Sequence, residues 1–367
     1  MADDRTSDAA WMDLALDLAR RGEGLTRPNP PVGAVVVRGD RVVGQGWHRR
    51  AGGAHAEVFA LRAAGAAARG ATLYVTLEPC CTQGRTPPCT EAILAAGVRR
   101  VVVAVRDPNP AHSGRGLRRL RAAGVDVAVG VRGAEAGRLI EPFAQWIHRG
   151  EPWVVLKLGM TLDGRIADAD GVSQWITSPA SRAVVQAERH RSDAILVGVG
   201  TVAADNPSLL PRPARGRRPW RVVVDPRGRT PPTARLLNDG AAVQTLIAVG
   251  PGCDPARAME FLRRGASVAV VEDQAGGRLS LRALLGHLGG LGILRVLCEG
   301  GAELAASLVE ARAADELLLF YAPLVLGGRA AAPAFGGAGR RLEDALRFRV
   351  METGRAGPDV IVRARPE

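Results

Sequence analysis

The chain has 367 residues, of which 47% are hydrophobic and 4% aromatic, and its formal net charge is +12 at pH 7. A chain of this length is usually too long to fold around a single hydrophobic core, so we expect a two-domain α/β protein. The basic excess is shared by both halves, with 21 basic against 14 acidic residues through Arg149 and 28 against 23 afterwards. Because neither half concentrates basic residues together with stacking aromatics, nucleic acid is not an expected partner.

Neither a membrane nor a secretory route is predicted. No apolar run reaches the roughly 18 residues that a membrane span requires. Residues 1–4, Met-Ala-Asp-Asp, lack the cationic start and apolar run of a secretory signal. The five cysteines show no disulfide framework, which indicates a reducing compartment and a cytoplasmic protein.

Helical and strand patterns alternate through the first half of the chain. Asp8 is predicted to cap the first helix, and Gly39-Asp40 is typical of a hairpin turn. The alternation indicates a largely parallel sheet covered by helices on both faces. The other predicted elements are strands at 32–37 and 41–47, a helix at 55–68, a strand at 72–77, a helix from about 88, a strand at 101–105, and a helix that closes near 122–125 onto a short strand.

Three residues between positions 55 and 89 have the chemistry of a catalytic zinc site. His55, Cys80 and Cys89 supply one imidazole and two thiolates, which hold zinc at three corners of a tetrahedron and leave the fourth to water. Glu57 follows the histidine by two residues and is free to move protons, as in zinc deaminases. The alternative is a structural zinc or an ordinary capping histidine, either of which would leave Glu57 without a role.

Asn29 is a further candidate in this half. It lies between Pro28 and Pro30, so its amide has a nearly fixed direction, which fits either a turn or a ligand contact. Cys81 is left out of the metal set because adjacent side chains in a tight turn rarely reach one ion. The remaining histidines have no metal spacing and are expected on the surface or in the core: His48, His112, His148, His190 and His287.

A domain boundary is predicted near Gly150-Glu151-Pro152, after a helix at 135–149. The expected domains are residues 1–149 and 150–367. A strand at 153–160 then carries Lys157, the only lysine of the chain. A lysine that persists among 48 arginines suggests a position that needs a compact charge, and we expect it in an active site rather than at a strand edge.

The second half contains strand ends that can bind a ligand. Gly198 and Gly200 end a buried strand and let a ligand approach the backbone, although they do not form the glycine fingerprint of a Rossmann fold. A strand at 293–298 ends in Glu299-Gly300-Gly301 before a helix at 302–310, which is typical of a cradle for a cofactor phosphate. The run 360–362 is predicted to add an edge strand.

The sequence resembles a known bifunctional family in both halves. Eight residues separate Cys80 from Cys89, whereas base deaminases usually have two between their cysteines. This insert resembles the deaminase half of the riboflavin-biosynthesis deaminase-reductase family. The segments 173–177, 192–202 and 205–209 resemble its reductase half, and the resemblance extends from about Asp13 to Gly328. Two residues depart from the family pattern, Thr82 where relatives commonly have histidine and Ile140 where they have asparagine.

The resemblance implies a cytidine-deaminase-like three-layer α/β domain followed by a dihydrofolate-reductase-like α/β domain. It implies zinc-dependent deamination of 2,5-diamino-6-ribosylamino-4(3H)-pyrimidinone 5′-phosphate. It also implies reduction of 5-amino-6-(5-phosphoribosylamino)uracil by NADPH to the ribitylamino form. A homo-oligomer, either a dimer or a tetramer, is expected from the same likeness.

Residue roles follow from the resemblance as well. Asn29 corresponds to a contact with the pyrimidine ring. The proton donor of the reduction is expected to be Lys157 or Asp205. The residues that correspond to NADPH contacts are Gly159, Trp175, Thr201, Asp205 and Gly301. Those that correspond to contacts with the sugar phosphate are Ser173, Arg189, Leu209, Arg212 and Glu299.

Two other functions compete with this interpretation. A base deaminase whose second half docks RNA predicts basic and aromatic residues clustered in one domain. A catalytically silent scaffold stabilised by zinc predicts the loss of Glu57 or a fourth protein ligand. The sequence shows none of these features.

Overall fold

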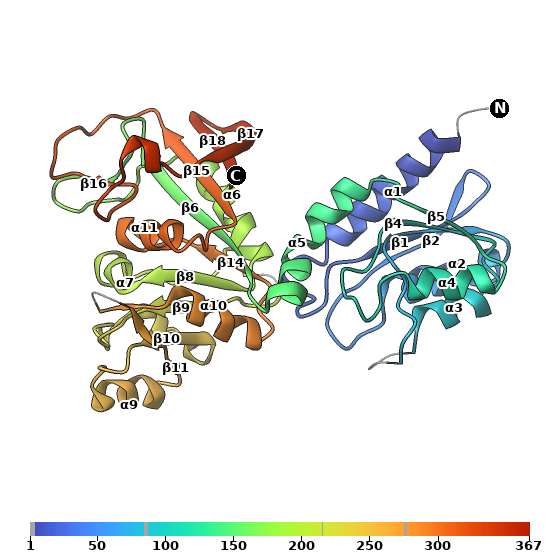
Figure 1. The fold of residues 1–367 in the computed structure, drawn as a ribbon, viewed down its shortest axis with the longest axis horizontal. Helices are drawn as coiled ribbons and strands as arrows, with labels where there is room; N and C mark the ends of the chain where they lie inside the picture. The colour runs from blue at the N-terminus through green and yellow to red at the C-terminus, as the bar shows by residue number, and fades with distance from the viewer. Residues whose placement is uncertain (1–3, 84–86, 215, 275–276) are drawn as a thin grey trace. The chain divides into compact units, whose positions relative to one another are not determined.

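The computed structural model describes residues 4–83, 87–214, 216–274 and 277–367. The chain forms two compact units, Met1–Gly150 and Glu151–Glu367 (Figure 1). The division falls one residue after the boundary expected from the sequence. Gly150 ends the last helix of the first unit with a left-handed backbone (φ 69°), a conformation that favours glycine.

The first unit is built on a five-stranded mixed sheet in the order β2-β1-β3-β4-β5. Its strands are β1 (Gly33–Arg38), β2 (Arg41–Trp47), β3 (Thr72–Leu77), β4 (Arg100–Val105) and β5 (Asp126–Val129). The strand β1 is antiparallel to both β2 and β3, whereas β3, β4 and β5 are parallel. The expected parallel pairing holds for β3, β4 and β5, and the antiparallel β1 and β2 form the hairpin that was predicted at Gly39-Asp40.

Helices cover both faces of this sheet, as Figure 1 shows. They are α1 (Asp4–Arg20), α2 (Ala56–Ala64), α3 (Cys89–Ala95), α4 (Arg115–Ala122) and α5 (Gly133–Arg149), and a 3₁₀ turn (Gly65–Ala68) follows α2. Alternate residues of β1 face opposite layers: Ala34 and Val36 pack in a core with α2, α3 and α4, while Val35 and Val37 pack with α1 and α5. The unit thus has the three layers expected from the sequence.

Asp8 does not cap the first helix, contrary to the prediction. It lies inside α1, and its buried carboxylate accepts hydrogen bonds from the Tyr74 hydroxyl (2.8 Å) and from both terminal nitrogens of Arg100 (2.9 Å each). A cap was expected because aspartate often begins helices. These partners lie 66 and 92 residues away, so local sequence could not reveal them.

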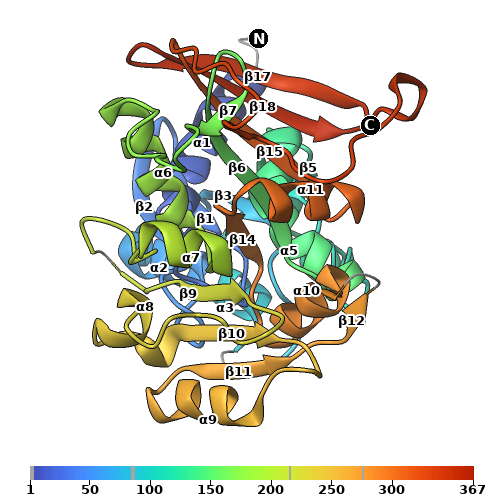
Figure 2. The same cartoon turned by 90° about the vertical axis from the view of Figure 1, so that its left-hand side faces the viewer.

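The second unit contains a nine-stranded sheet in the order β11-β10-β9-β8-β14-β6-β15-β18-β17 (Figure 2). Its strands are β6 (Trp153–Thr161), β8 (Ala194–Gly198), β9 (Trp220–Val224), β10 (Thr245–Val249), β11 (Ser267–Val270), β14 (Arg295–Cys298), β15 (Glu316–Ala322), β17 (Phe348–Ala356) and β18 (Asp359–Pro366). The strands from β11 to β15 are parallel, and β18 and β17 extend the sheet in antiparallel fashion. The run 360–362 lies in β18 and not at the edge, because β17 pairs outside it.

Helices pack on this sheet over two hydrophobic cores, one on each face. They are α6 (Pro179–Arg191), α7 (Val199–Asp205), α8 (Arg235–Asn238), α9 (Pro255–Arg263), α10 (Leu281–Gly290) and α11 (Ala302–Glu310). Short two-stranded pairs join β7 (Arg165–Ala167) to β16 (Ala332–Pro333) and β12 (Asp273–Gln274) to β13 (Arg278–Leu279). The carboxyl ends of the neighbouring parallel strands β8, β14 and β6 meet at one edge, where open α/β sheets bind ligands. Within the described part of the chain, no helix combines the length and hydropathy that crossing a membrane requires.

Candidate active sites

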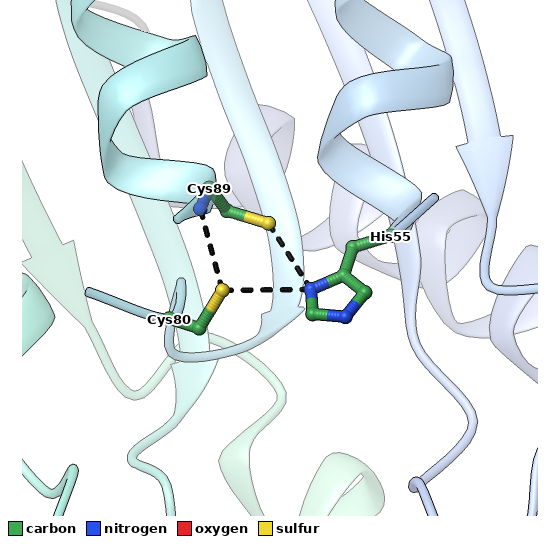
Figure 3. A group of neighbouring side chains, drawn as sticks. All are labelled: His55, Cys80 and Cys89. Atoms are coloured by element: carbon green, nitrogen blue, oxygen red, sulfur yellow. Dashed lines mark hydrogen bonds between the residues drawn. The ribbon is translucent and has the colours of Figure 1, made fainter. Parts of the chain in front are cut away.

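The three predicted zinc ligands converge in the first unit, as Figure 3 shows. The Nδ1 atom of His55 lies 3.2 Å from the Cys89 sulfur and 3.5 Å from the Cys80 sulfur. His55 precedes α2, Cys80 follows β3, and Cys89 begins α3, so three elements bring the ligands together. Among the described residues, no fourth histidine, cysteine or carboxylate joins this group. One imidazole and two sulfurs fit a tetrahedral zinc with one corner open.

The electrostatics of the group favour metal binding. Hydrogen bonds, the largest from Cys89, lower the pKa of the Cys80 thiol to about 4. The backbone N–H of Cys89 donates to the Cys80 sulfur (3.3 Å) and also lowers this pKa. The pKa of Cys89 itself is raised, chiefly because its thiol donates to Cys80. The lowered pKa therefore favours the thiolate form of Cys80, which is the form that binds zinc.

Glu57 lies in the first turn of α2, and its side chain is buried beside the ligand group. Burial is the largest cause that raises the pKa of Glu57 to about 7. A carboxyl group with a pKa near neutrality can both accept and donate a proton. Its place next to the metal ligands, without belonging to them, fits the predicted proton shuttle.

A cavity of about 500 Å³ opens in front of this group. Asn29 and His48 form part of its wall, and the Nδ2 atom of Asn29 lies 3.1 Å from Nε2 of His48. The Nδ1 atom of His48 lies 3.0 Å from the carbonyl oxygen of Ala54, so the ring is held from both sides. Other lining residues include Glu57, Glu78, Thr82, Asp107, Asn109, His112, Phe143, Trp146 and Ile147.

The residues predicted for the reductase half gather around a second cavity, of about 440 Å³, in the second unit. It lies at the sheet edge where β6, β8 and β14 end. All eleven predicted residues line it: Lys157, Gly159, Ser173, Trp175, Arg189, Thr201, Asp205, Leu209, Arg212, Glu299 and Gly301. Positions that are up to 144 residues apart in the sequence therefore meet in one place.

Three charged side chains form the floor of this cavity. Arg189 makes a bidentate pair with Glu299, with Nε–Oε1 at 2.6 Å and Nη2–Oε2 at 3.1 Å, and Lys157 Nζ lies 4.0 Å from Glu299 Oε2. Burial lowers the pKa of Lys157 below its ordinary value. Burial alone would raise the pKa of Glu299, but Arg189 and Lys157 together hold it below its usual range.

Two glycines and a carboxylate shape the wall of this cavity. A Cβ atom at Gly159 would lie 2.9 Å from Cγ2 of Thr177, so a larger residue would crowd this wall. Gly301 is the residue before α11, whose first N–H groups can bind a phosphate. The carboxylate of Asp205 accepts hydrogen bonds from Ser173 Oγ (3.2 Å) and Gln174 Nε2 (3.4 Å).

Comparison with known sequences separates the same two halves. Residues 5–105 match the cytidine and deoxycytidylate deaminase zinc-binding region, and residues 152–362 match the RibD C-terminal domain. Riboflavin biosynthesis protein RibD of Bacillus amyloliquefaciens is 42% identical over 359 residues, which cover 97% of this chain and 96% of the relative. This chain belongs to the RibD family. The protein of that name from Escherichia coli K12 is also 42% identical, over 96% of this chain and 98% of its own length.

Solved RibD structures share the fold along the whole chain. Form 2 of Acinetobacter baumannii RibD has a TM-score of 0.89 at 38% identity and covers 100% of both chains. A Thermotoga maritima protein described as a diaminohydroxyphosphoribosylaminopyrimidine deaminase/5-amino-6-(5-phosphoribosylamino)uracil reductase has a TM-score of 0.88 at 34% identity, again over 100% of both. These likenesses confirm the predicted fold class.

The RibD-family sites contain residues that the sequence did not single out. His48 was expected to have no role, yet it contacts Asn29 in the first cavity. His112 also lines that cavity, 3.4 Å from Thr82 Oγ1. The sequence contains no signal for these two histidines, because they make hydrogen-bonding contacts and do not belong to a metal-ligand motif. Ile140, the other departure from the family pattern, is buried in α5, and nothing in the structure explains the substitution.

The second cavity of this RibD-family chain has further unpredicted residues in its lining and directly behind it. Arg182 lies over the ring of Trp175, with its ζ carbon 4.6 Å from the ring centroid. Gln186 Oε1 accepts a hydrogen bond from the backbone N–H of Arg212 (2.7 Å). The fully buried Arg221 donates to the carbonyl oxygen of Ser208 (3.2 Å). The last two contacts hold the loop of Leu209 and Arg212, and they link segments whose proximity only the fold creates.

Proposed function

We propose that this chain is a bifunctional enzyme of riboflavin biosynthesis. Residues 1–149 deaminate 2,5-diamino-6-ribosylamino-4(3H)-pyrimidinone 5′-phosphate with zinc. Residues 150–367 then reduce 5-amino-6-(5-phosphoribosylamino)uracil with NADPH to the ribitylamino form. The observation that carries this proposal is that one RibD-family chain contains both a zinc-type triad beside a buried glutamate and a separate cavity lined by every predicted reductase residue.

The first reaction is a hydrolysis in which His55, Cys80 and Cys89 would hold the metal. Zinc, when bound, would lower the pKa of a water molecule. Glu57 would take a proton from the attacking water, whose oxygen bonds to the amino-bearing ring carbon, and would deliver that proton to the amino group as the C–N bond breaks and ammonia leaves. Asn29, oriented by its contact with His48, presents its amide to the pyrimidine ring.

The second reaction opens the ribose ring. NADPH supplies the hydride that adds to the sugar carbon bonded to the amine. The bond from that carbon to the ring oxygen breaks, and the oxygen takes a proton to become a hydroxyl group. Lys157 is the favoured donor, since its lowered pKa eases proton release, and Asp205 is the alternative.

The two ligands would share the second cavity, with its lining residues divided between them. We assign NADPH to Gly159, Trp175, Thr201 and Asp205, with the phosphates near Gly301 at the start of α11. The sugar phosphate would contact Ser173, Leu209, Glu299 and the cations Arg189 and Arg212, since guanidinium groups match phosphate oxygens.

The two competing functions lose support. The second half matches the RibD C-terminal domain, which supports a reductase there in preference to an RNA-docking domain. The ligand group keeps Glu57 beside it, and among the described residues no further protein ligand closes the fourth corner. We also propose a cytoplasmic location, supported by five unpaired cysteines, and a homo-oligomer, supported by the family likeness alone.

The proposal is tested with Glu57→Gln. Because glutamine cannot shuttle the proton, we expect ammonia release from the diaminopyrimidinone substrate to fall at least about a hundredfold. NADPH oxidation with the deaminated intermediate should stay at the wild-type rate. The control is Glu91→Gln, which removes an exposed carboxylate on α3 that pairs with Arg119. Wild-type ammonia release by Glu57→Gln would contradict the proton-shuttle role.

A further inference from the structure

Glu78 is a buried carboxylate in front of the segment that carries Cys80, and neither metal binding nor proton transfer uses it. Its oxygens accept four backbone hydrogen bonds. Oε2 accepts from the N–H groups of Asp107 (3.3 Å) and Gly114 (2.9 Å), and Oε1 accepts from those of Gly116 (3.0 Å) and Leu117 (3.3 Å). Hydrogen bonds to a charged acceptor are stronger than neutral ones, so this carboxylate is a firm anchor.

All four donors belong to the segment 107–117, which forms one wall of the first cavity. Asp107, Asn109 and His112 of this segment line the cavity. The segment is also bonded internally: Asp107 Oδ1 accepts from the N–H of Asn109 (2.8 Å), and the carbonyl oxygen of Asn109 accepts from the N–H of His112 (2.9 Å). A shift at the anchor would therefore move all three cavity-facing residues together.

The opposite end of the anchor is tied to the metal ligands. Glu78 precedes Cys80 by two residues, and its own N–H donates to the carbonyl oxygen of Val105 (2.9 Å) at the end of β4. The start of α4 packs tightly here, because a Cβ atom at Gly116 would lie 2.1 Å from the carbonyl oxygen of Pro79. One carboxylate thus joins the ligand-bearing segment to the cavity wall.

We propose that Glu78 is a positioning residue for the deamination. It holds Asp107, Asn109 and His112 at a fixed place relative to His55, Cys80 and Cys89. The side chains of Asp107 and Asn109 offer acceptors and donors that suit the amino and carbonyl groups of a polar heterocycle. Glu78 acts through them, because its carboxylate oxygens are occupied by backbone N–H groups of the segment 107–117. This inference rests on the deaminase function proposed above and adds the device that aligns its substrate.

The first test is Glu78→Gln, which preserves shape but directs an amide nitrogen at backbone N–H donors. We expect the KM for ammonia release to rise about tenfold or more, with a smaller fall in kcat, since misplacement of binding groups weakens alignment. Zinc content should remain at the wild-type level, and NADPH oxidation with deaminated intermediate should be unchanged. Glu91→Gln, the exposed carboxylate on α3, is the matched control and should behave as wild type.

The second test reaches the same contact from the other side. Gly114 has a left-handed backbone (φ 73°), so Gly114→Ala strains the loop and displaces its N–H from Glu78 without altering a charge or a metal ligand. The same rise in KM with retained zinc is expected, and this variant decides the matter if Glu78→Gln fails to fold.

The outcomes separate this inference from the function on which it rests. Absence of ammonia release by the wild-type enzyme would sink the proposed function. With an active wild type, an unchanged KM in Gly114→Ala and in folded Glu78→Gln overturns the positioning role. A loss of activity that simply follows a loss of zinc also overturns it, because Glu78 would then support the metal rather than the substrate. A lower melting temperature with unchanged kinetics would reduce Glu78 to a structural cap and equally overturn the proposal.

Discussion

Lys157 is the only lysine of the chain, and the proposed role as proton donor would not be open to an arginine in its place. It extends from β6 into the second cavity, beside the Arg189–Glu299 pair. Burial is the main cause of its lowered pKa, the carboxylate of Glu299 acts in the opposite direction, and Arg189 adds to the lowering. A guanidinium group stays protonated to above pH 12 and could not release a proton in this setting.

The lowered pKa predicts the pH dependence of the reductase. If protonated Lys157 serves the ring oxygen, NADPH oxidation should fall as the pH rises through the depressed pKa, at a pH below the ordinary lysine value of 10.5. Lys157→Arg should lower the rate and remove this alkaline limb, because its charge does not titrate in the range. The pH profiles of kcat with deaminated intermediate provide the measurement. An identical alkaline limb in both proteins would point to Asp205 or another group.

At the scale of elements, the first site depends on how closely α2 lies on the sheet. A Cβ atom at Gly44 of β2 would meet the carbonyl oxygen of Ala60 at 2.1 Å, and one at Gly46 would meet Cβ of Phe59 at 2.4 Å. Backbone-to-backbone contact is therefore possible only because these two positions lack side chains. His55 and Glu57 lie at the start of the same helix, so the packing of α2 against β2 determines their position.

Gly44→Ala should consequently disturb both stability and metal binding. The added methyl group forces α2 away from β2, and overpacking of this kind typically costs about 1–3 kcal/mol. Urea unfolding followed by circular dichroism and zinc content after dialysis are the measurements. The control is Gly137→Ala in α5, where the new methyl group meets nothing within 4 Å and helix propensity favours alanine. Equal stability of Gly44→Ala and wild type would show that α2 can move without loss.

At the scale of the whole molecule, each unit has its own cores. Two buried clusters belong to the first unit, and two others belong to the second. The zinc ligands and the reductase cavity fall in different units. Separate cores predict that a change in one site is not transmitted as unfolding to the other.

Zinc removal tests this independence. Treatment with a chelator should abolish ammonia release, while NADPH oxidation with deaminated intermediate is expected to continue unchanged. In thermal unfolding, added zinc should raise only the transition of the first unit, because a ligand stabilises the part that binds it. Addition of zinc to the apoprotein should restore ammonia release. Parallel loss of both activities on chelation would show that the two units depend on one metal.

The sequence by itself determined the features that are local or chemical in nature. The strand at 72–77 and the helix at 302–310 have the bounds that were predicted, because such local patterns follow from the neighbours of each residue. Residue type and spacing also singled out His55, Cys80 and Cys89, since few side chains can bind zinc. The reductase set came from resemblance rather than from physical spacing.

Only the tertiary structure decided the features that depend on distant partners. The sequence predicted that Asp8 caps a helix, whereas its buried carboxylate accepts hydrogen bonds from Tyr74 and Arg100. It gave His48 no role and left Glu78 unexplained, although the first meets Asn29 and the second anchors a loop that starts 29 residues later. A buried polar group must find a partner, but that partner can come from any segment that the fold brings near. Such choices are fixed by packing in three dimensions and leave no periodic trace in the chain.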